Sequence, residues 1–180
     1  MQRCKDVRRE YQRIYREVRN RGTVGQAYVA AGYLDAEVRA AYNDLIQLLP
    51  NEENMLLGDA TELEKAFEFL ETDILAFRTG YWKAEIFTKL KHVMLPLLFS
   101  SRVRDLALTY VRWTGYRREY YQLCRLTILH ADAALVLELD KICSDAAEKD
   151  QLKKARSLLY RILNSRQDLR AIVPLEKVKL

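Results

Sequence analysis

Apolar residues recur at intervals of three and four along nearly the whole chain, the period of helices that bury one face. The clearest stripes are Val7, Tyr11, Ile14 and Val18; Leu63, Phe67, Leu70, Ile74 and Phe77; Ile86, Leu90, Val93 and Leu97; and Leu152, Ala155, Leu159 and Ile162. No segment alternates with a period of two, and no Asn-Gly or Asp-Gly pair marks a hairpin. The pattern therefore predicts an all-α protein, a helical bundle of about seven to eight helices.

Residues that start and stop helices set the expected boundaries in the first half. Gly22 ends the first helix, and "PNEEN" at residues 50–54 reads as a linker. "TELE" at residues 61–64 matches a capping box in which Thr61 is the N-cap. Gly80 is suited to end that helix in a left-handed conformation.

In the second half, Pro96 is expected to kink or end one helix. A serine cap in "SSRVRDLALTYVRW" then starts another helix that runs to Gly115. A long helix is predicted from residue 116 to about residue 142, with its apolar second half central in the fold. Asp145 and Glu148 would cap the last helix.

Two further features bear on organisation. Thr-Gly-Tyr occurs twice, 35 residues apart, at residues 79–81 and 114–116, and each copy opens a predicted helix. That period suits a short helical-hairpin solenoid, which is an alternative to the plain bundle. Residues 1–50 hold a basic helix and a glycine-turned helix pair, and residues 51–180 hold a helical core and assembly region, unless both form one continuous domain.

Composition places the chain among globular proteins, with 49% hydrophobic and 31% charged residues and only 6 Gly and 3 Pro. No opening segment has the layout of a signal peptide. The longest uncharged run, "HVMLPLLFSS", covers about ten residues, whereas a membrane span needs roughly 20. We expect a soluble intracellular protein, in a host cytoplasm or a virion if it is viral.

Charge is segregated along the chain. Residues 1–21 hold eight basic and three acidic side chains, a net charge of +5, and residues 22–76 hold two and eleven, a net charge of −9. Residues 77–130 hold ten and three, a net charge of +7, and residues 131–180 hold ten and eight, a net charge of +2. Such blocks predict either pairing with one another during assembly or basic faces that meet an anion.

The stretch "GTVGQAYVAAGYLDAEVRAAYNDLIQLLP" at residues 22–50 has the spacing of a helix-turn-helix. Gly32 supplies the turn, Ala31 and Val38 can pack closely, and Asp35 can cap the second helix. A tight Ala-rich helix pair without a ligand is the alternative. The residues predicted to contact nucleic acid are Arg8, Arg9, Arg13 and Arg16 of the basic first helix, with Tyr33, Arg39 and Asn43 near base edges.

"QAYVAAGYLDAEV" at residues 26–38 also resembles the amino-terminal DNA-binding segment of phage terminase small subunits. The resemblance implies a ring-forming binder of packaging-site DNA with a helical oligomerisation core and no catalytic activity. It places Gly32 and Tyr33 on the turn and the residues after Asp35 on the recognition helix. The chain departs from the pattern at Tyr28, where alanine is usual.

The charge of the second helix also departs from that of a DNA reader. The predicted second helix carries three acidic residues, Asp35, Glu37 and Asp44, and a single basic residue, Arg39. Because affinity for DNA rests largely on neutralising phosphates, the basic first helix would have to supply that charge.

A second candidate surface is the basic and aromatic segment at residues 77–130. Interleaved cations and rings can combine phosphate contacts with base stacking, although such rings also pack hairpin corners and such cations also pair with neighbouring acids. The candidate basic residues of this surface are Lys83, Lys89, Lys91, Arg102, Arg104, Arg112, Arg117, Arg118 and Arg125, and its candidate aromatic residues are Tyr81, Trp82, Trp113, Tyr116, Tyr120 and Tyr121.

No motif points to catalysis, a metal or a cofactor. His92 and His130 are the only histidines and lie outside any metal-binding spacing, and the chain has no phosphate-binding loop or nucleophile elbow. Cys4, Cys124 and Cys143 are too widely spaced for a zinc pair and are expected to be buried or idle thiols.

Two functions follow from these patterns. The first is a non-enzymatic, oligomeric nucleic-acid-binding protein of viral or mobile-element type, with DNA as the expected partner. The second is a structural or adaptor protein, such as a coat, nucleoprotein or scaffold, that assembles with copies of itself or with a protein partner. Neither function involves a membrane.

Overall fold

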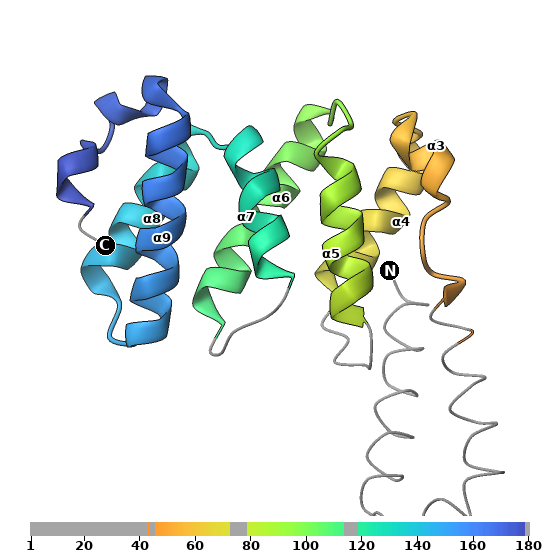
Figure 1. Cartoon of the computed structure of the whole chain (residues 1–180), viewed down its shortest axis with the longest axis horizontal. Coiled ribbons are helices and arrows are strands. Elements are labelled where there is room, and N and C mark those ends of the chain that lie inside the picture. The colour runs from red at the N-terminus through yellow and green to blue at the C-terminus, as the bar shows by residue number, and fades with distance from the viewer. Residues whose placement is uncertain (1–42, 44–45, 73–78, 114–118, 179–180) are drawn as a thin grey trace, which may run out of the picture. The chain divides into compact units, whose positions relative to one another are not determined.

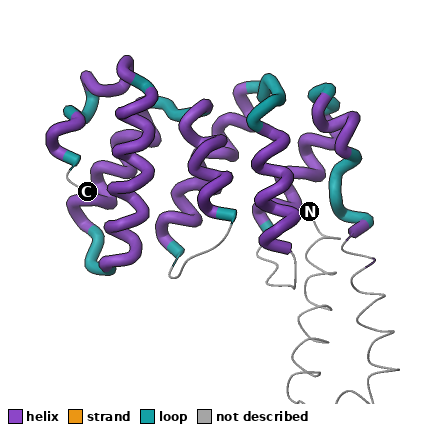
Figure 2. Tube along the Cα trace, in the orientation of Figure 1, coloured by secondary structure: helices purple, strands orange, loops and turns teal. Residues whose placement is uncertain are grey.

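The computed structural model describes residues 43, 46–72, 79–113 and 119–178, and all regular structure in these residues is helical (Figures 1 and 2). The described residues form seven α-helices and two short 3-10 helices, which confirms the all-α prediction. They are α3 (Glu52–Leu56), α4 (Ala60–Glu71), α5 (Thr79–Leu90), α6 (Leu97–Arg112), α7 (Tyr120–Leu129), α8 (Ala133–Asp145), α9 (Lys149–Ser165), η1 (Gln167–Ala171) and η2 (Leu175–Lys177). The basic first helix and nearly all of the predicted helix-turn-helix lie outside the described residues and stay predictions.

The chain divides into two compact units, residues 1–80 and residues 81–180. The division expected near Pro50 is a different one and stays a prediction. The two units are described separately below.

In the first unit, the predicted linker is a helix. Asn51 caps α3, because its Oδ1 accepts a hydrogen bond of 3.1 Å from the Asn54 N–H. Gly58, with a φ of 82°, then makes the left-handed turn between α3 and α4. The prediction that residues 50–54 form a linker is therefore wrong beyond Asn51.

Helix α4 begins two residues earlier than the capping-box prediction. Asp59 is the N-cap, and its Oδ1 accepts hydrogen bonds from the N–H groups of Thr61 at 2.9 Å and Glu62 at 3.0 Å. Thr61 lies in the first turn, because the earlier aspartate satisfies the free amides first. The carboxylate of Glu62 accepts from the Asn51 N–H at 2.7 Å and so joins the start of α3 to α4.

The core of this unit follows the predicted stripe as far as the structure describes it. Leu63, Phe67 and Leu70 are fully buried, while Ile74 and Phe77 lie outside the described residues. Helix α4 ends at Thr72, whose hydroxyl donates to the carbonyls of Glu68 and Phe69. Gly80 does not end this helix, contrary to prediction, because it lies in the first turn of α5.

In the second unit, α5 ends at Leu90 and Pro96 is the N-cap of α6. The serine cap is therefore a wrong prediction. Proline lacks an amide hydrogen and has a fixed φ, so it suits the start of a helix. Leu97 begins the separate helix α6, so it does not continue the face of α5 that carries Ile86 and Leu90. Leu97 is 88% exposed, whereas Val93 is buried as predicted.

The long helix predicted from residue 116 to residue 142 is two helices. Helix α7 ends at His130, and Asp132 caps α8 by accepting a 2.8 Å hydrogen bond from the Leu135 N–H. The apolar second half of the predicted helix corresponds to α8. Leu135 and Leu139 are fully buried there, as predicted, but Leu137 is 55% exposed.

Helices α6 and α7 form one antiparallel pair, and α8 and α9 form the next (Figure 1). Helix α9 packs against α6, α7 and α8 and against both 3-10 helices. Its predicted stripe is buried at Ala155, Leu159 and Ile162, with Leu152 half-buried. Asp145 ends α8 rather than capping α9, because Glu148 is the N-cap residue of α9.

The two consecutive pairs are compatible with a bundle or a short solenoid, so both alternatives stay open. The first Thr-Gly-Tyr opens α5 as predicted. The second lies outside the described residues.

Candidate nucleic-acid interface

Most residues of the predicted amino-terminal interface lie outside the described residues, so their role in binding stays a prediction. Arg8, Arg9, Arg13, Arg16, Tyr33 and Arg39 belong to this group. Asn43 is described and is exposed on a helical turn, where its carbonyl accepts a 3.1 Å hydrogen bond from the Gln47 N–H.

Lys83 of the predicted basic and aromatic patch is buried and does not reach an exposed surface. It is 2% exposed, because it shares a face of α5 with the buried Phe87 and Leu90, four and seven residues further on. Trp82 and Trp113 are half-buried, and Arg117 and Arg118 lie outside the described residues. Lys83 must therefore be removed from the predicted contact residues.

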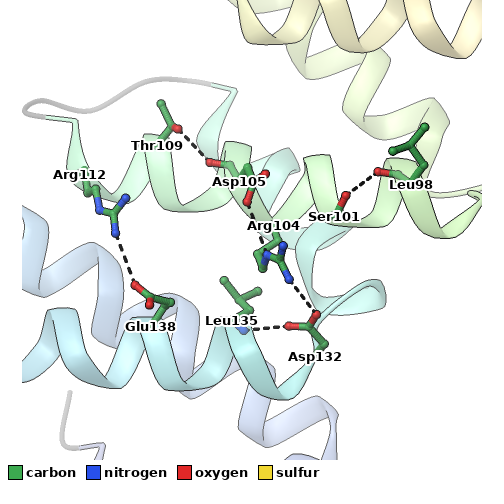
Figure 3. Close-up of polar contacts among 9 residues, drawn as sticks. All are labelled: Leu98, Ser101, Arg104, Asp105, Thr109, Arg112, Asp132, Leu135 and Glu138. Atoms are coloured by element: carbon green, nitrogen blue, oxygen red, sulfur yellow. Dashed lines mark hydrogen bonds and ion pairs between the residues drawn. The ribbon is translucent and has the colours of Figure 1, made fainter.

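Acidic side chains neutralise several other cations of the predicted patch. The Lys89 ammonium lies 2.7 Å from a Glu85 carboxylate oxygen. Arg112 pairs with Glu138 across α6 and α8 at 3.5 Å (Figure 3). Part of the +7 block is thus balanced within the fold, as the alternative interpretation expected.

Arg104 is held on the same face of α6. Its Nη1 lies 3.3 Å from Asp132 Oδ2 on the cap of α8, and its Nε lies 3.5 Å from Asp105 Oδ1 (Figure 3). Arg104 and Arg112 therefore form ion pairs between α6 and α8. The cations without an acidic partner in the described part of the chain lie elsewhere.

Two arginines without an acidic partner among the described residues lie beside the ring of Tyr121. Arg125 lies four residues along α7 from Tyr121, and its guanidinium carbon is 5.9 Å from the centroid of the ring. Arg161 comes from α9, and its guanidinium carbon is 5.5 Å from the same centroid. Tyr121 is 46% exposed. We call Lys91, Tyr121, Arg125 and Arg161 the Tyr121 cluster.

Lys91 completes the cluster from the end of α5. Burial lowers the pKa of Lys91, and the positive charge of Arg125 lowers it further. Within the part of the chain that the structure describes, none of the three cations forms an ion pair. Like charges held together without a carboxylate make a favourable site for an anion.

Polar contacts of Lys154 and Glu119 join α7 to α6 and α9. Lys154 of α9 donates to the Trp113 carbonyl at 2.6 Å and to the Tyr110 carbonyl at 3.4 Å. Its ammonium lies 5.8 Å from the ring centroid of Tyr120, whose hydroxyl donates to the Lys154 carbonyl at 3.2 Å. The neighbouring Glu119 is also buried and accepts from the Tyr110 hydroxyl at 3.2 Å. These contacts thus join α7 to its two neighbours at Glu119 and Tyr120, next to Tyr121 in the sequence.

Sequence analysis included Lys91, Tyr121 and Arg125 but missed Arg161. Arg161 belongs to the block of residues 131–180, whose net charge is only +2. Its relevance comes from the packing of α9 on α7. Arg161 lies seven residues after Lys154 and so on the same face of α9, a spacing that could have drawn attention to it.

A metal site would need several of the remaining titratable side chains to come together in the described part of the chain. No group of three His, Cys, Asp or Glu side chains comes together there. Cys124 is buried as expected, and burial raises the pKa of its thiol to about 11, so the thiol is protonated at neutral pH. The Nδ1 of His130 lies 3.0 Å from the Ser100 hydroxyl, with which it shares a hydrogen bond.

Comparison with known protein families, curated proteins and solved structures finds none that matches this chain. The resemblance to terminase small subunits therefore stays a prediction from residues 26–38. No described helix is long and apolar enough to cross a bilayer.

Proposed function

We propose that this chain is a non-enzymatic nucleic-acid-binding protein, of the viral or mobile-element type that its amino-terminal resemblance implies. In this proposal the Tyr121 cluster binds the sugar-phosphate backbone. The observation that supports the proposal is the approach of Arg125 and Arg161 to one exposed ring, with Lys91 close enough to Arg125 to feel its charge and no ion pair from these cations to any described carboxylate.

The chemistry of phosphate recognition suits this arrangement. Each guanidinium can donate two parallel hydrogen bonds to phosphate oxygens, and a lysine adds a point charge. Neutralising phosphates releases condensed counterions, so affinity falls as salt rises. If the three cations meet about three phosphates, affinity falls about 20- to 40-fold between about 50 and 200 mM salt.

A charge-matched pair of variants tests the proposal. Changing Arg125 and Arg161 together to Gln should weaken binding of a labelled oligonucleotide and make the salt dependence shallower by about two phosphates. The control changes Lys141 and Lys153 to Gln, because both are exposed and the loss of net charge is the same. Equal effects of the two double variants would contradict a role for the cluster.

The amino-terminal surface is tested in parallel. Changing Arg8, Arg9 and Arg13 to Ala should weaken binding if the basic first helix serves a helix-turn-helix. Binding that depends on this triple variant alone would keep the proposed function and move the site away from the Tyr121 cluster.

Assembly with a protein is the second candidate function, and an exposed apolar group favours it. Met94, Leu97 and Leu98 are 96%, 88% and 66% exposed around the start of α6. Contiguous exposed apolar side chains of this kind mark contact surfaces. An assembly through them should survive high salt and be lost when Leu97 and Leu98 are changed to Lys, as measured by light scattering.

A further inference from the structure

We infer that the Tyr121 cluster takes single-stranded nucleic acid, because the exposed ring and its flanking guanidiniums offer a stacking surface to an unpaired base. This inference rests on the proposed function and specifies its ligand. It adds a contact with a base to the phosphate contacts argued above.

The first observation is the setting of the ring. Tyr121 is 46% exposed although it is a large aromatic side chain on a helix packed into the unit. Among the described residues its hydroxyl has no hydrogen-bond partner, so no polar contact accounts for its position. The ring is therefore accessible and is not needed as a polar anchor.

The second observation is the arrangement of planar groups beside the ring. Arg125 approaches Tyr121 from the same helix and Arg161 approaches it from α9, at 5.9 and 5.5 Å from the centroid. Cation–π attraction holds the two arginines near the ring. The surface thus presents an aromatic plane with a guanidinium on each of two neighbouring helices, and both kinds of plane stack on nucleobases.

These features discriminate between strand types. In a duplex the faces of the bases are covered by their neighbours, and only phosphates and base edges are accessible. In a single strand a base face is free, and stacking it on an aromatic side chain contributes to affinity irrespective of sequence. A surface that recognised phosphates alone would need the cations but would gain nothing from the exposed ring.

The test compares ligands that share phosphates but differ in bases. The probes are a 12-nucleotide oligothymidylate, an abasic oligomer with the same number of phosphates and a 12-base-pair duplex. The proteins are the full chain, Tyr121→Leu and the control Tyr121→Phe, each checked for native helix content by circular dichroism. Affinities are measured by fluorescence anisotropy at low salt.

We expect the full chain and Tyr121→Phe to bind oligothymidylate about tenfold more tightly than the abasic oligomer, a difference of about 1.4 kcal/mol. In Tyr121→Leu that preference should disappear, while binding of the abasic oligomer and of the duplex stays unchanged. The phenylalanine variant keeps the stacking plane, so it separates stacking from the hydroxyl group.

The experiment distinguishes failure of base stacking at Tyr121 from failure of nucleic-acid binding itself. Equal binding of oligothymidylate and the abasic oligomer by the full chain would overturn the inference and leave phosphate binding intact. So would a Tyr121→Leu variant that loses affinity for all three probes equally, because the ring would then only support packing. Failure of all three probes to bind would refute the proposed function itself.

Discussion

Lys154 shows how one side chain can hold three helices together. The last carbonyls of a helix lack partners within that helix, and a cation near them is also favoured by the helix dipole. At the end of α6, Lys154 of α9 supplies that cation to Tyr110 and Trp113, and it lies beside the ring of Tyr120 on α7.

The variant Lys154→Met keeps the length of the side chain and removes the donor. It should lower the free energy of unfolding by about 1–3 kcal/mol, because partly buried carbonyls lose a charged partner. The exposed Lys153→Met is the control and should stay within about 0.5 kcal/mol of the unchanged protein. Urea unfolding followed by tryptophan fluorescence suits this comparison, since Trp82 and Trp113 both lie in the second unit. Equal stability of the two variants would contradict the role of Lys154.

His130 gives the second unit a dependence on pH. Burial lowers the pKa of its imidazole below the ordinary value of 6.5, so the unfolded chain binds a proton more readily than the folded chain. The contribution of neutral His130 to stability is complete above pH 6.5 and is lost as the pH falls through the pKa of the folded state. The pKa values of the Glu62 and Asp168 carboxyls are lowered, so these groups titrate at a lower pH than His130 and do not interfere.

The experiment compares two histidine variants. Between pH 7.5 and pH 5, His130→Gln should flatten the fall in unfolding free energy, whereas His92→Gln should leave it unchanged because His92 is exposed. A slope that His130→Gln does not alter would show that another group titrates there.

At the scale of the element, the helices could be predicted from sequence but several of their ends could not. The stripes of period 3.6 identified α4 and α9 well, because burial of one face is visible in the pattern. Ends were missed where two candidate caps compete. Asp59 precedes Thr61, Pro96 precedes the serines, and Asp132 divides an apolar run whose periodicity alone suggests one helix.

Asp132 provides the test of that division. Changing it to Ala removes the cap of α8 and should lower the free energy of unfolding by about 1 kcal/mol. Asp132→Asn keeps a capping oxygen and should cost less than half as much, because the ion pair with Arg104 is largely exposed and weak. An equal loss in both variants would show that the charge, rather than the cap, matters.

At the scale of the whole molecule, charge segregation predicted that the basic blocks either pair with the acidic ones or meet an anion, but it could not indicate which cations remain uncompensated. Arg112 and Lys89 belong to the most basic block, yet each has an acidic partner, and Lys83 is buried. Arg161 belongs to a nearly neutral block and lies in the cluster. Long-range pairing of this kind depends on which helices pack together, and periodicity within one helix does not encode that.

The proposed site is therefore a product of tertiary structure. Tyr121 and Arg161 are far apart in the sequence and meet where α7 packs against α9, and Lys91, after the end of α5, lies near enough to Arg125 of α7 to feel its charge. The type of interaction, cations beside aromatic rings, could be predicted from the sequence. The residues that take part in it depend on how the helices pack.

Photochemical crosslinking tests the central claim most directly, because it reports where nucleic acid touches the chain. A 12-nucleotide single strand in which 5-iodouracil replaces thymine would be bound to the full chain, irradiated and digested, and the crosslinked peptides identified by mass spectrometry. We expect crosslinks on α7 at Tyr121, reduced by excess unlabelled strand and by the Arg125→Gln and Arg161→Gln double variant. Crosslinks confined to residues 1–45, with none on α7 or α9, would contradict that claim.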